Sequence, residues 1–186
     1  MKPAILLVSL LALATPAAAQ QGPAFGEIGY GGTGCPDGTA LVSPGLGNGS
    51  VALQLSDYAV GDNGRGVDRK TCALALPVDV PEGMAVAIRL IGLQGTAKLP
   101  ADIEATLSIE AFTAGDSGEV TEFPLVGPLD VSFFRFLQIP DDKLVWSGCG
   151  TDTNLRLNTS LRSKGNADAA VALTGLSVYR IATKPC

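Results

Sequence analysis

The 186-residue chain contains no histidine, carries a formal net charge of −5 and has 4 cysteines. The absence of histidine excludes Ser-His-Asp and Cys-His mechanisms and removes the commonest side-chain ligand of catalytic zinc and copper. The acidic balance and the lack of a basic patch interleaved with aromatic residues argue against a nucleic-acid partner. Carboxylates, lysines and oxygen-ligated metals remain as means of catalysis.

The N-terminal segment has the pattern of a secretory signal peptide. Lys2 provides a positive charge, residues 4–14 form an apolar core, and Ala17–Ala19 offer small side chains for cleavage. The apolar run is too short to cross a bilayer, which takes roughly 20 residues. We therefore expect residues 1–19 to be removed, leaving a secreted or periplasmic protein with no membrane insertion after cleavage.

The remaining residues suit one domain with a Gly-rich N-terminal lead-in. The lead-in covers residues 20–34 and is expected to be extended and loosely held up to Cys35. From there, apolar residues alternate with smaller or polar ones at the period of a β-strand. The alternating positions are Val51, Leu53 and Leu55; Leu74, Leu76, Val78 and Val80; Val86, Ile88 and Leu90; Ala105, Leu107, Ile109 and Ala111; and Leu155, Leu157, Thr159 and Leu161.

Glycine- and proline-rich turns separate these runs, for example at Pro44-Gly45, Pro81-Glu82-Gly83 and Lys164-Gly165-Asn166. Short strands at this spacing predict an all-β fold, a single antiparallel β-sandwich over residues 35–186. A closed β-barrel is the alternative. Only residues 97–105 have a composition compatible with one turn of helix.

The four cysteines are Cys35, Cys72, Cys149 and Cys186. Their even number, their wide spacing and the predicted export indicate two disulfides, and no C-x-x-C pair suggests a zinc or redox site. Three pairings are possible. We favour Cys35–Cys149 with Cys72–Cys186, because Cys72 opens one predicted strand and Cys186 ends another, as antiparallel neighbours would.

Three segments around the cysteines resemble a known family. They are Gly32-Thr33-Gly34-Cys35-Pro36-Asp37-Gly38-Thr39; Arg69-Lys70-Thr71-Cys72-Ala73-Leu74-Ala75-Leu76, with Pro81-Glu82-Gly83 after it; and Trp146-Ser147-Gly148-Cys149-Gly150, followed by Leu155, Leu157, Asn158 and Thr159. With the terminal Cys186, this set is similar to the secreted four-cysteine family catalogued as domain of unknown function 4360 (DUF4360). The resemblance covers essentially the whole mature chain. It implies a single secreted β-rich domain and implies no activity.

One segment, residues 62–68, resembles part of a calcium-binding loop. Asp62 and Asp68 would provide carboxylate oxygens, which calcium prefers. However, the bidentate glutamate of an EF-hand is absent, and Arg65 lies inside the segment. We therefore favour a solvated loop and predict no cofactor and no metal, with Asp62 and Asp68 as the only candidate ligands.

Two further patterns suggest catalysis but lack the necessary partners. Residues 115–119 mimic the nucleophile segment of trypsin-like proteases, but no histidine can accept the serine proton, so we expect a polar hairpin turn. Glu104 and Glu110 share one face of a predicted strand. At about 3.3 Å per residue they lie about 20 Å apart, which exceeds either glycosidase geometry. We predict no catalytic residue.

The aromatic residues offer two further hypotheses. Trp146, the only tryptophan, precedes Cys149 and is expected to pack against a disulfide in the core. Phe133, Phe134 and Phe136 form the densest aromatic run. We favour a central strand buried on both faces; the alternative is an exposed apolar strip that contacts a partner.

Together these observations favour a secreted, non-enzymatic β-sandwich module of unknown ligand. It would act by binding or structural association at the cell envelope or outside the cell, on an unknown protein or a glycan, and the sequence identifies no binding residues. Self-association through an open sheet edge is a further option. The alternative function is a carboxylate-dependent hydrolase acting on polysaccharide, which two carboxylates within about 10 Å in a cleft would favour.

Overall fold

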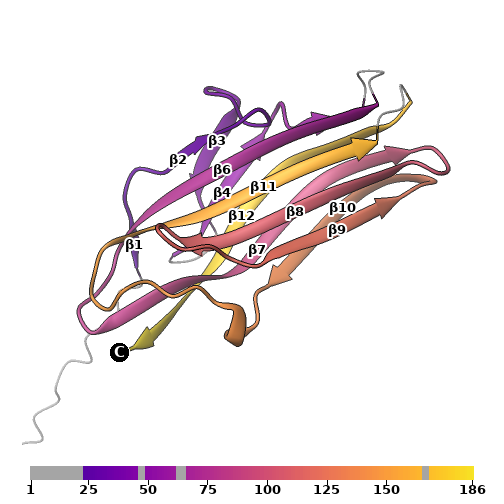
Figure 1. The fold of residues 1–186 in the computed structure, drawn as a ribbon. Helices are drawn as coiled ribbons and strands as arrows, with labels where there is room; N and C mark the ends of the chain where they lie inside the picture. Colours follow the sequence, from indigo (N-terminus) through magenta and orange to yellow (C-terminus); the bar gives the residue numbers. More distant parts are fainter. Residues whose placement is uncertain (1–22, 46–48, 62–65, 165–167) are drawn as a thin grey trace, which may run out of the picture.

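The computed structural model describes residues 23–45, 49–61, 66–164 and 168–186. Within these residues the chain forms 12 strands and one short 3-10 helix, η1 (Asp141–Lys143). The strands build two antiparallel sheets that lie one over the other as two layers (Figure 1). The predicted signal peptide and Asp62 lie outside the described residues.

The first layer, sheet A, is formed by the following strands: β1 (Ala24–Phe25), β2 (Gly29–Gly31), β6 (Val67–Asp79), β8 (Glu104–Thr113), β9 (Val120–Val126) and β11 (Thr153–Lys164). Its order is β1-β6-β11-β8-β9, and β2 also pairs with β6. The long central ladders of β11 with β6 and β8 place residues far apart in the sequence side by side.

The second layer, sheet B, is formed by the following strands: β3 (Ala40–Pro44), β4 (Val51–Leu55), β5 (Ala59–Val60), β7 (Met84–Leu99), β10 (Leu129–Gln138) and β12 (Ala170–Pro185). Its order is β10-β7-β12-β4-β3, and β5 also pairs with β12. Strands β10 and β3 are therefore the edges of sheet B. Neither sheet closes on itself within the described residues, so the predicted β-sandwich is confirmed over the barrel.

The core lies between the two sheets and is built from the alternating apolar positions. Leu107 of β8 lies opposite Leu161 of β11, and both are buried, as is Leu53 of β4 in the other sheet. Successive side chains of a strand point to opposite faces, which explains why every second residue is apolar. Full burial of one such leucine or isoleucine stabilises the fold by about 1.5–3 kcal/mol.

The lead-in is held more firmly than the sequence predicted. Strands β1 and β2 both pair with β6, with Phe25 opposite Val78 and Tyr30 opposite Leu74. The Gly26 N–H also donates to the carbonyl of Pro77 (2.9 Å). Pairing supplies partners for backbone groups on this side of β6, which would otherwise form an open edge.

The possible helical turn at residues 97–105 is not formed. Strand β7 continues to Leu99 and β8 begins at Glu104, with a short turn between them in which the Ile103 N–H donates to the Pro100 carbonyl (3.4 Å). Leu99 and Ala105 are both buried. Strand pairing and burial within the two packed sheets therefore outweigh the local preference of the sequence for a helical turn.

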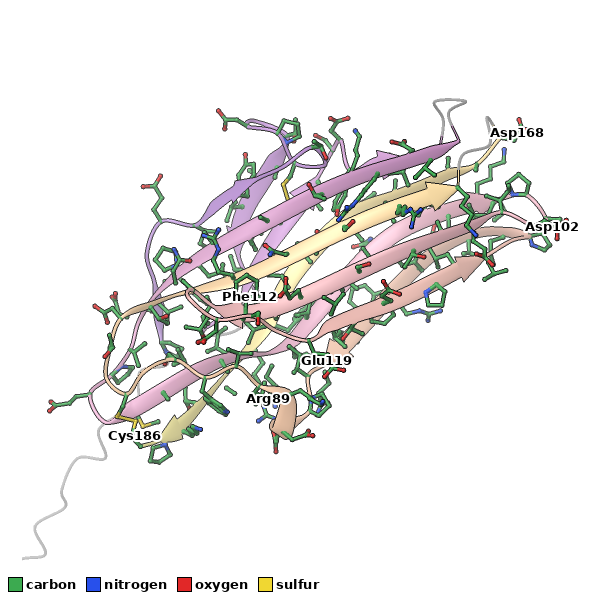
Figure 2. All side chains as sticks on the ribbon, in the orientation of Figure 1. Arg89, Asp102, Phe112, Glu119, Asp168 and Cys186 are labelled. Carbon is green, nitrogen blue, oxygen red and sulfur yellow. A yellow bond between two sulfur atoms is a disulfide. The ribbon has the colours of Figure 1, made fainter. Side chains whose placement is uncertain are left out.

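The disulfides join Cys35 to Cys72 and Cys149 to Cys186, so the favoured pairing of Cys35–Cys149 with Cys72–Cys186 is wrong. That pairing assumed that the strands at Cys72 and Cys186 were neighbours. In fact Cys72 lies in β6 of sheet A, whereas Cys186 follows β12 of sheet B. Cys186 lies at the end of the sandwich opposite to Asp102 and Asp168 (Figure 2).

The first two cysteine motifs have structural roles around the Cys35–Cys72 bridge. The Gly34 N–H donates to the Thr71 carbonyl (2.8 Å), and the Thr71 N–H donates to Oγ1 of Thr33 (3.0 Å). The ring of Tyr58 lies so close to Gly34 that any side chain there would collide with it. These motif residues hold the bridge and its surrounding loop in place.

The third motif fixes the other bridge in the same way. The Ser147 N–H donates to the Val86 carbonyl (2.9 Å), and the Val86 N–H donates to Oγ of Ser147 (3.0 Å). The Gly150 N–H donates to the Met84 carbonyl (2.8 Å). The segment before Cys149 is thereby anchored to the start of β7. None of the described residues forms a helix long and apolar enough to span a membrane.

Candidate binding surface

The aromatic run lies on an edge strand, so the expectation of a central strand buried on both faces is wrong. Strand β10 pairs with β7 alone, from Leu129 opposite Leu99 to Gln138 opposite Leu90. Phe133 packs against the core, whereas Phe134 and Phe136 point away from it and are 47% and 56% exposed. The alternative, an exposed apolar strip, describes these two side chains.

Phe134 and Phe136 continue into a third ring on the outer face of sheet B. The rings of Phe134 and Phe136 meet edge to face, with centroids 4.7 Å apart, and Phe136 meets Tyr179 of β12 at 5.3 Å. Tyr179 lies over Gly92 of the intervening strand β7, where a Cβ atom would collide with the ring. These three rings, called the aromatic patch below, therefore span β10, β7 and β12.

Two adjoining hollows, of about 310 and 580 Å³, extend over the same face from Tyr179 to Leu41 of the opposite edge strand. They share Gln54, Gln94 and Thr174 in their walls. We call the combined hollow the trough. Its outward-facing lining consists of Leu41, Ser43, Ala52, Gln54, Gln94, Thr174, Gly175, Ser177 and Tyr179.

The strand register explains the shape of the trough. Gly175 of β12 lies opposite Gln94 on one side and Gln54 on the other. Ser177 lies in the next outward-facing row, opposite Gly92 and Ala52. Small residues thus form the floor, and the two glutamines stand on either side of Gly175, with Cα atoms about 10 Å apart at the usual strand spacing.

The polar groups of the trough are uncharged, and two of them, the side-chain amides of Gln54 and Gln94, are available to a ligand. Among the residues that the structure describes, none of those lining either hollow is acidic or basic. Within the described part of the chain, the side-chain amides of Gln54 and Gln94 make no hydrogen bond to the protein. Each amide can therefore donate and accept hydrogen bonds with a ligand.

The outer face of sheet A has a different character. A hollow of about 520 Å³ there is lined by Arg69, Glu110 and Glu122, among others. Arg69 Nε–H donates to Oγ of Ser160 (2.8 Å), while Glu110 accepts from the Gly118 N–H (3.2 Å) and from Nδ2 of Asn158 (3.4 Å). The side chains of Arg69 and Glu110 are thus already engaged in contacts within the protein.

Sequence reasoning missed Glu122 as a neighbour of Glu110. Glu110 lies opposite Val120, and Glu122 lies opposite Ser108, so the two glutamates are diagonal neighbours on one face. Such diagonal positions are about 7–8 Å apart. The alternation on either side of the 115–119 turn could have revealed this pair. Glu104, at the start of β8, instead forms an ion pair with Lys164 (3.2 Å).

The remaining sequence candidates are not brought together into a site. Oδ2 of Asp68 accepts a hydrogen bond from the Gly61 N–H (3.1 Å), and the described residues contain no cluster of three or more acidic or cysteine side chains that could hold a metal. Residues 115–119 lie in the connection between β8 and β9, where the Asp116 N–H donates to the Thr113 carbonyl (2.9 Å).

Trp146 lies in a small cluster separate from the main core. It packs there with Ile139 against the buried residues Ala87, Leu144 and Ala182. Nζ of Lys184 lies 4.3 Å from the centroid of its ring, a cation–π contact. The expected place in the core is therefore not found, because the segment before Cys149 packs outside the main core rather than between the sheets.

Comparison with known sequences gives two matches. The family model described as "Domain of unknown function (DUF4360)" matches residues 23–185. An "Uncharacterized secreted protein" of Arthroderma benhamiae is 31% identical over 141 residues, which cover 73% of this chain and 57% of the relative. The chain thus spans little more than half of that relative's length. The relative's name and the two disulfides confirm the predicted location, secreted or periplasmic.

Comparison with solved structures gives three matches with low TM-scores. The enzymatically active domain of bacteriophage CBA120 tailspike protein 4 has a TM-score of 0.33 and 13% identity over 81% of this chain and 19% of that one. TmCBM61 in complex with β-1,4-galactotriose has a TM-score of 0.31 and 11% identity, over 86% and 88% of the two chains. A family 11 carbohydrate-binding module from Clostridium thermocellum has a TM-score of 0.22 and 8% identity, over 89% and 92%. At TM-scores below 0.5 these likenesses carry no inference about function.

Proposed function

We propose that this chain, which belongs to the DUF4360 family, is a secreted, non-enzymatic module that binds a partner outside the cell through the outer face of sheet B. The observation that carries the proposal is the aromatic patch. Two of its rings, Phe134 and Phe136, are about half exposed on an edge strand. Large apolar side chains gathered on a surface are typical of interaction sites.

The aromatic patch is suited to binding for energetic reasons. Phenylalanine and tyrosine rings bury much area on contact and lose little conformational freedom, because each has only two rotatable side-chain bonds. The edge-to-face contacts from Phe134 to Phe136 and from Phe136 to Tyr179 hold the rings in a fixed arrangement before any ligand arrives. Such preorganisation lowers the entropic cost of association.

The residues of the cysteine motifs have a structural role instead. Their glycine, threonine and serine residues are engaged in holding the two disulfides, as at Gly34 and Ser147. Residues that build a scaffold do not by themselves define an activity. This supports a binding function located on the sheet face, away from the motifs that define the family resemblance.

A paired surface substitution tests the proposal. We expect the Phe134→Ser/Phe136→Ser variant of the oxidised protein to lose retention on cell-envelope and extracellular-matrix material of the producing organism. The matched control is Val120→Ser/Val126→Ser, since both valines are 53% exposed on β9, the edge strand of sheet A. Co-sedimentation with the insoluble material measures retention. Equal retention of the two variants would overturn the proposal.

The alternative, a carboxylate-dependent hydrolase acting on polysaccharide, is favoured by one observation, the diagonal pair Glu110 and Glu122 in the hollow of sheet A. Both oxygens of Glu110 already accept hydrogen bonds from the protein, which argues against a role in proton transfer. Release of reducing ends from polysaccharides by the purified protein, abolished in both Glu110→Gln and Glu122→Gln, would establish the hydrolase in place of the module.

A further inference from the structure

We infer that the trough of sheet B binds an uncharged polysaccharide chain, laid across the strands with sugar rings against the aromatic patch. The inference rests on the proposed function and names its ligand class. It depends on three properties of the trough: its neutrality, its unoccupied amides and its length.

The neutrality of the trough selects against ionic ligands. Its lining contains hydroxyl, amide and apolar side chains and no acidic or basic group. A polyanion or a charged peptide would lose hydration there without gaining an opposite charge. The net charge of the chain, −5, adds repulsion of polyanions at longer range. An uncharged ligand has neither disadvantage.

The hydrogen-bonding groups of the trough match hydroxyl groups. A sugar hydroxyl both donates and accepts, and so does the amide of Gln54 or Gln94 taken as a whole. The amides stand on either side of Gly175, whose missing side chain leaves space between them. Because neither amide is engaged by the described protein residues, a ligand gains hydrogen bonds there without breaking existing ones.

The length and openness of the surface favour a chain over a single sugar. The path from the patch on β10 to Leu41 on β3 crosses four inter-strand spacings, which is about 19 Å at about 4.8 Å each. Strands of sheet B form most of its floor, and Gly38, Thr39 and Ser56 line the end beside β3. A surface of this length accommodates several sugar units. The rings of the aromatic patch provide an apolar surface on which the flat, C–H-bearing face of a sugar ring can stack.

Binding of defined polysaccharides tests the inference. We would measure the mobility of the full secreted protein, with both disulfides intact, in native gels that contain a soluble uncharged β-glucan, galactan, mannan or xylan, and in gels that contain polygalacturonate or heparin. We expect at least one uncharged polymer to retard the protein. In a parallel calorimetric titration, the affinity for that polymer should be the same at about 0.1 M and about 1 M salt, because screening acts on charges only.

Single substitutions in the trough sharpen the test. Gln54→Ala and Gln94→Ala should each weaken binding about 3- to 10-fold, the effect of losing one or two hydrogen bonds. Glu122→Gln, in the hollow of sheet A, is the control and should leave binding unchanged. Equal effects of Gln94→Ala and Glu122→Gln would contradict the location of the site.

The outcomes separate this inference from the proposed function. One outcome is that envelope material retains the protein through Phe134 and Phe136 while no uncharged polysaccharide binds it. In that case the proposed ligand class is wrong, and the proposed function as a binding module is retained. Binding to anionic polymers only, or retention lost after protease treatment of the envelope material, would overturn the ligand class in the same way. If the phenylalanine variant retains like the valine control, the proposed function itself fails.

Discussion

Two polar side chains on the outer face of sheet A differ in their contacts from two on the outer face of sheet B. On sheet A, Arg69 and Glu110 hydrogen-bond to neighbours in the same sheet, which links β6, β8 and β11. On sheet B, Gln54 and Gln94 stand beside small residues and make no such contacts within the described residues. Polar groups that satisfy one another contribute to the fold, whereas unsatisfied exposed groups remain available to a ligand. This difference supports the proposal that recognition takes place on the outer face of sheet B.

The two disulfides offer a second contrast between the sheets. Each joins cysteines 37 residues apart, so each closes a loop of the same length. Cys72 lies in β6 of sheet A, and it and its partner Cys35 are 1% and 0% exposed. Cys149 and Cys186, at the end of sheet B, are exposed. Equal loop lengths make the entropic effect on the unfolded chain equal, so any difference in stability reports packing.

The largest expected effect comes from removing either bridge. In the chain-entropy model, a loop of this length contributes about 4 kcal/mol to the free energy of unfolding. We expect Cys149→Ala/Cys186→Ala to cost up to that amount, and Cys35→Ala/Cys72→Ala to cost more, because it also leaves a cavity in the core. Urea denaturation of both variants measures the difference.

Graded reduction provides an independent check on the disulfide comparison. Thiol alkylation followed by mass spectrometry should show that Cys149–Cys186 opens first, since a reductant reaches an exposed bridge more easily. Equal stability losses in the two alanine variants, together with simultaneous reduction, would show that the burial difference has no energetic consequence.

The next effect concerns the contact between the sheets. Tyr58, in the connection between β4 and β5 of sheet B, exchanges a hydrogen bond with Oγ1 of Thr159 in β11 of sheet A (3.0 Å). Burial raises the pKa of Tyr58 to about 12 from its usual value of 10.0, against the lowering effect of the Thr159 hydrogen bond. The folded state therefore holds this proton at pH values where the unfolded state releases it.

The sign of the pH dependence follows. The stability associated with protonated Tyr58 is fully present below pH 10 and is lost as the pH rises from about 10 to about 12, by about 2–3 kcal/mol. Chemical denaturation across this range measures the slope. Tyr58→Phe should flatten that part of the curve. An equal slope in the wild type and in Tyr58→Phe would show that other groups cause the alkaline loss.

The strands and the core could be predicted from the sequence because their signal is local. A period of two residues, as in Ala105, Leu107, Ile109 and Ala111, depends only on neighbouring side chains pointing to opposite faces. Which strand lies next to which depends on contacts between distant segments. For this reason the local pattern wrongly predicts that the aromatic run of β10 lies in the sheet interior, and it pairs Cys72 with Cys186 although their strands belong to different sheets.

The candidate site was less predictable than the fold. Gln54, Gln94, Gly175 and Tyr179 meet only because β4 and β7 both pair with β12. No spacing in the sequence brings these residues together, and each alone is an ordinary strand residue. Glu122 differs, because it lies one hairpin away from Glu110, and the alternation across that turn was sufficient to place both on one face.

The smallest expected effects are those of two glycine-to-alanine substitutions, which should change the stability in opposite directions on the two faces. Gly29 in β2 of sheet A and Gly92 in β7 of sheet B both lack a positive φ, so backbone strain does not require glycine at either position. A Cβ atom on Gly29 would lie 3.7 Å from Cβ of Ala75, an ordinary contact, whereas one on Gly92 would collide with the Tyr179 ring. Gly29→Ala should therefore stabilise the protein by about 0.4–1 kcal/mol, because it restricts the unfolded chain.

Gly92→Ala should instead destabilise by about 1 kcal/mol, the lower end of the usual range for added volume, because Tyr179 is half-buried and its ring can move aside. Combining it with Tyr179→Ser removes the collision, so Gly92→Ala should become neutral or stabilising in that background. Urea denaturation of the four proteins in this cycle measures the coupling. Additive effects would mean that Tyr179 does not rest on Gly92, and the aromatic patch would then lack the fixed third ring on which the recognition surface of sheet B depends.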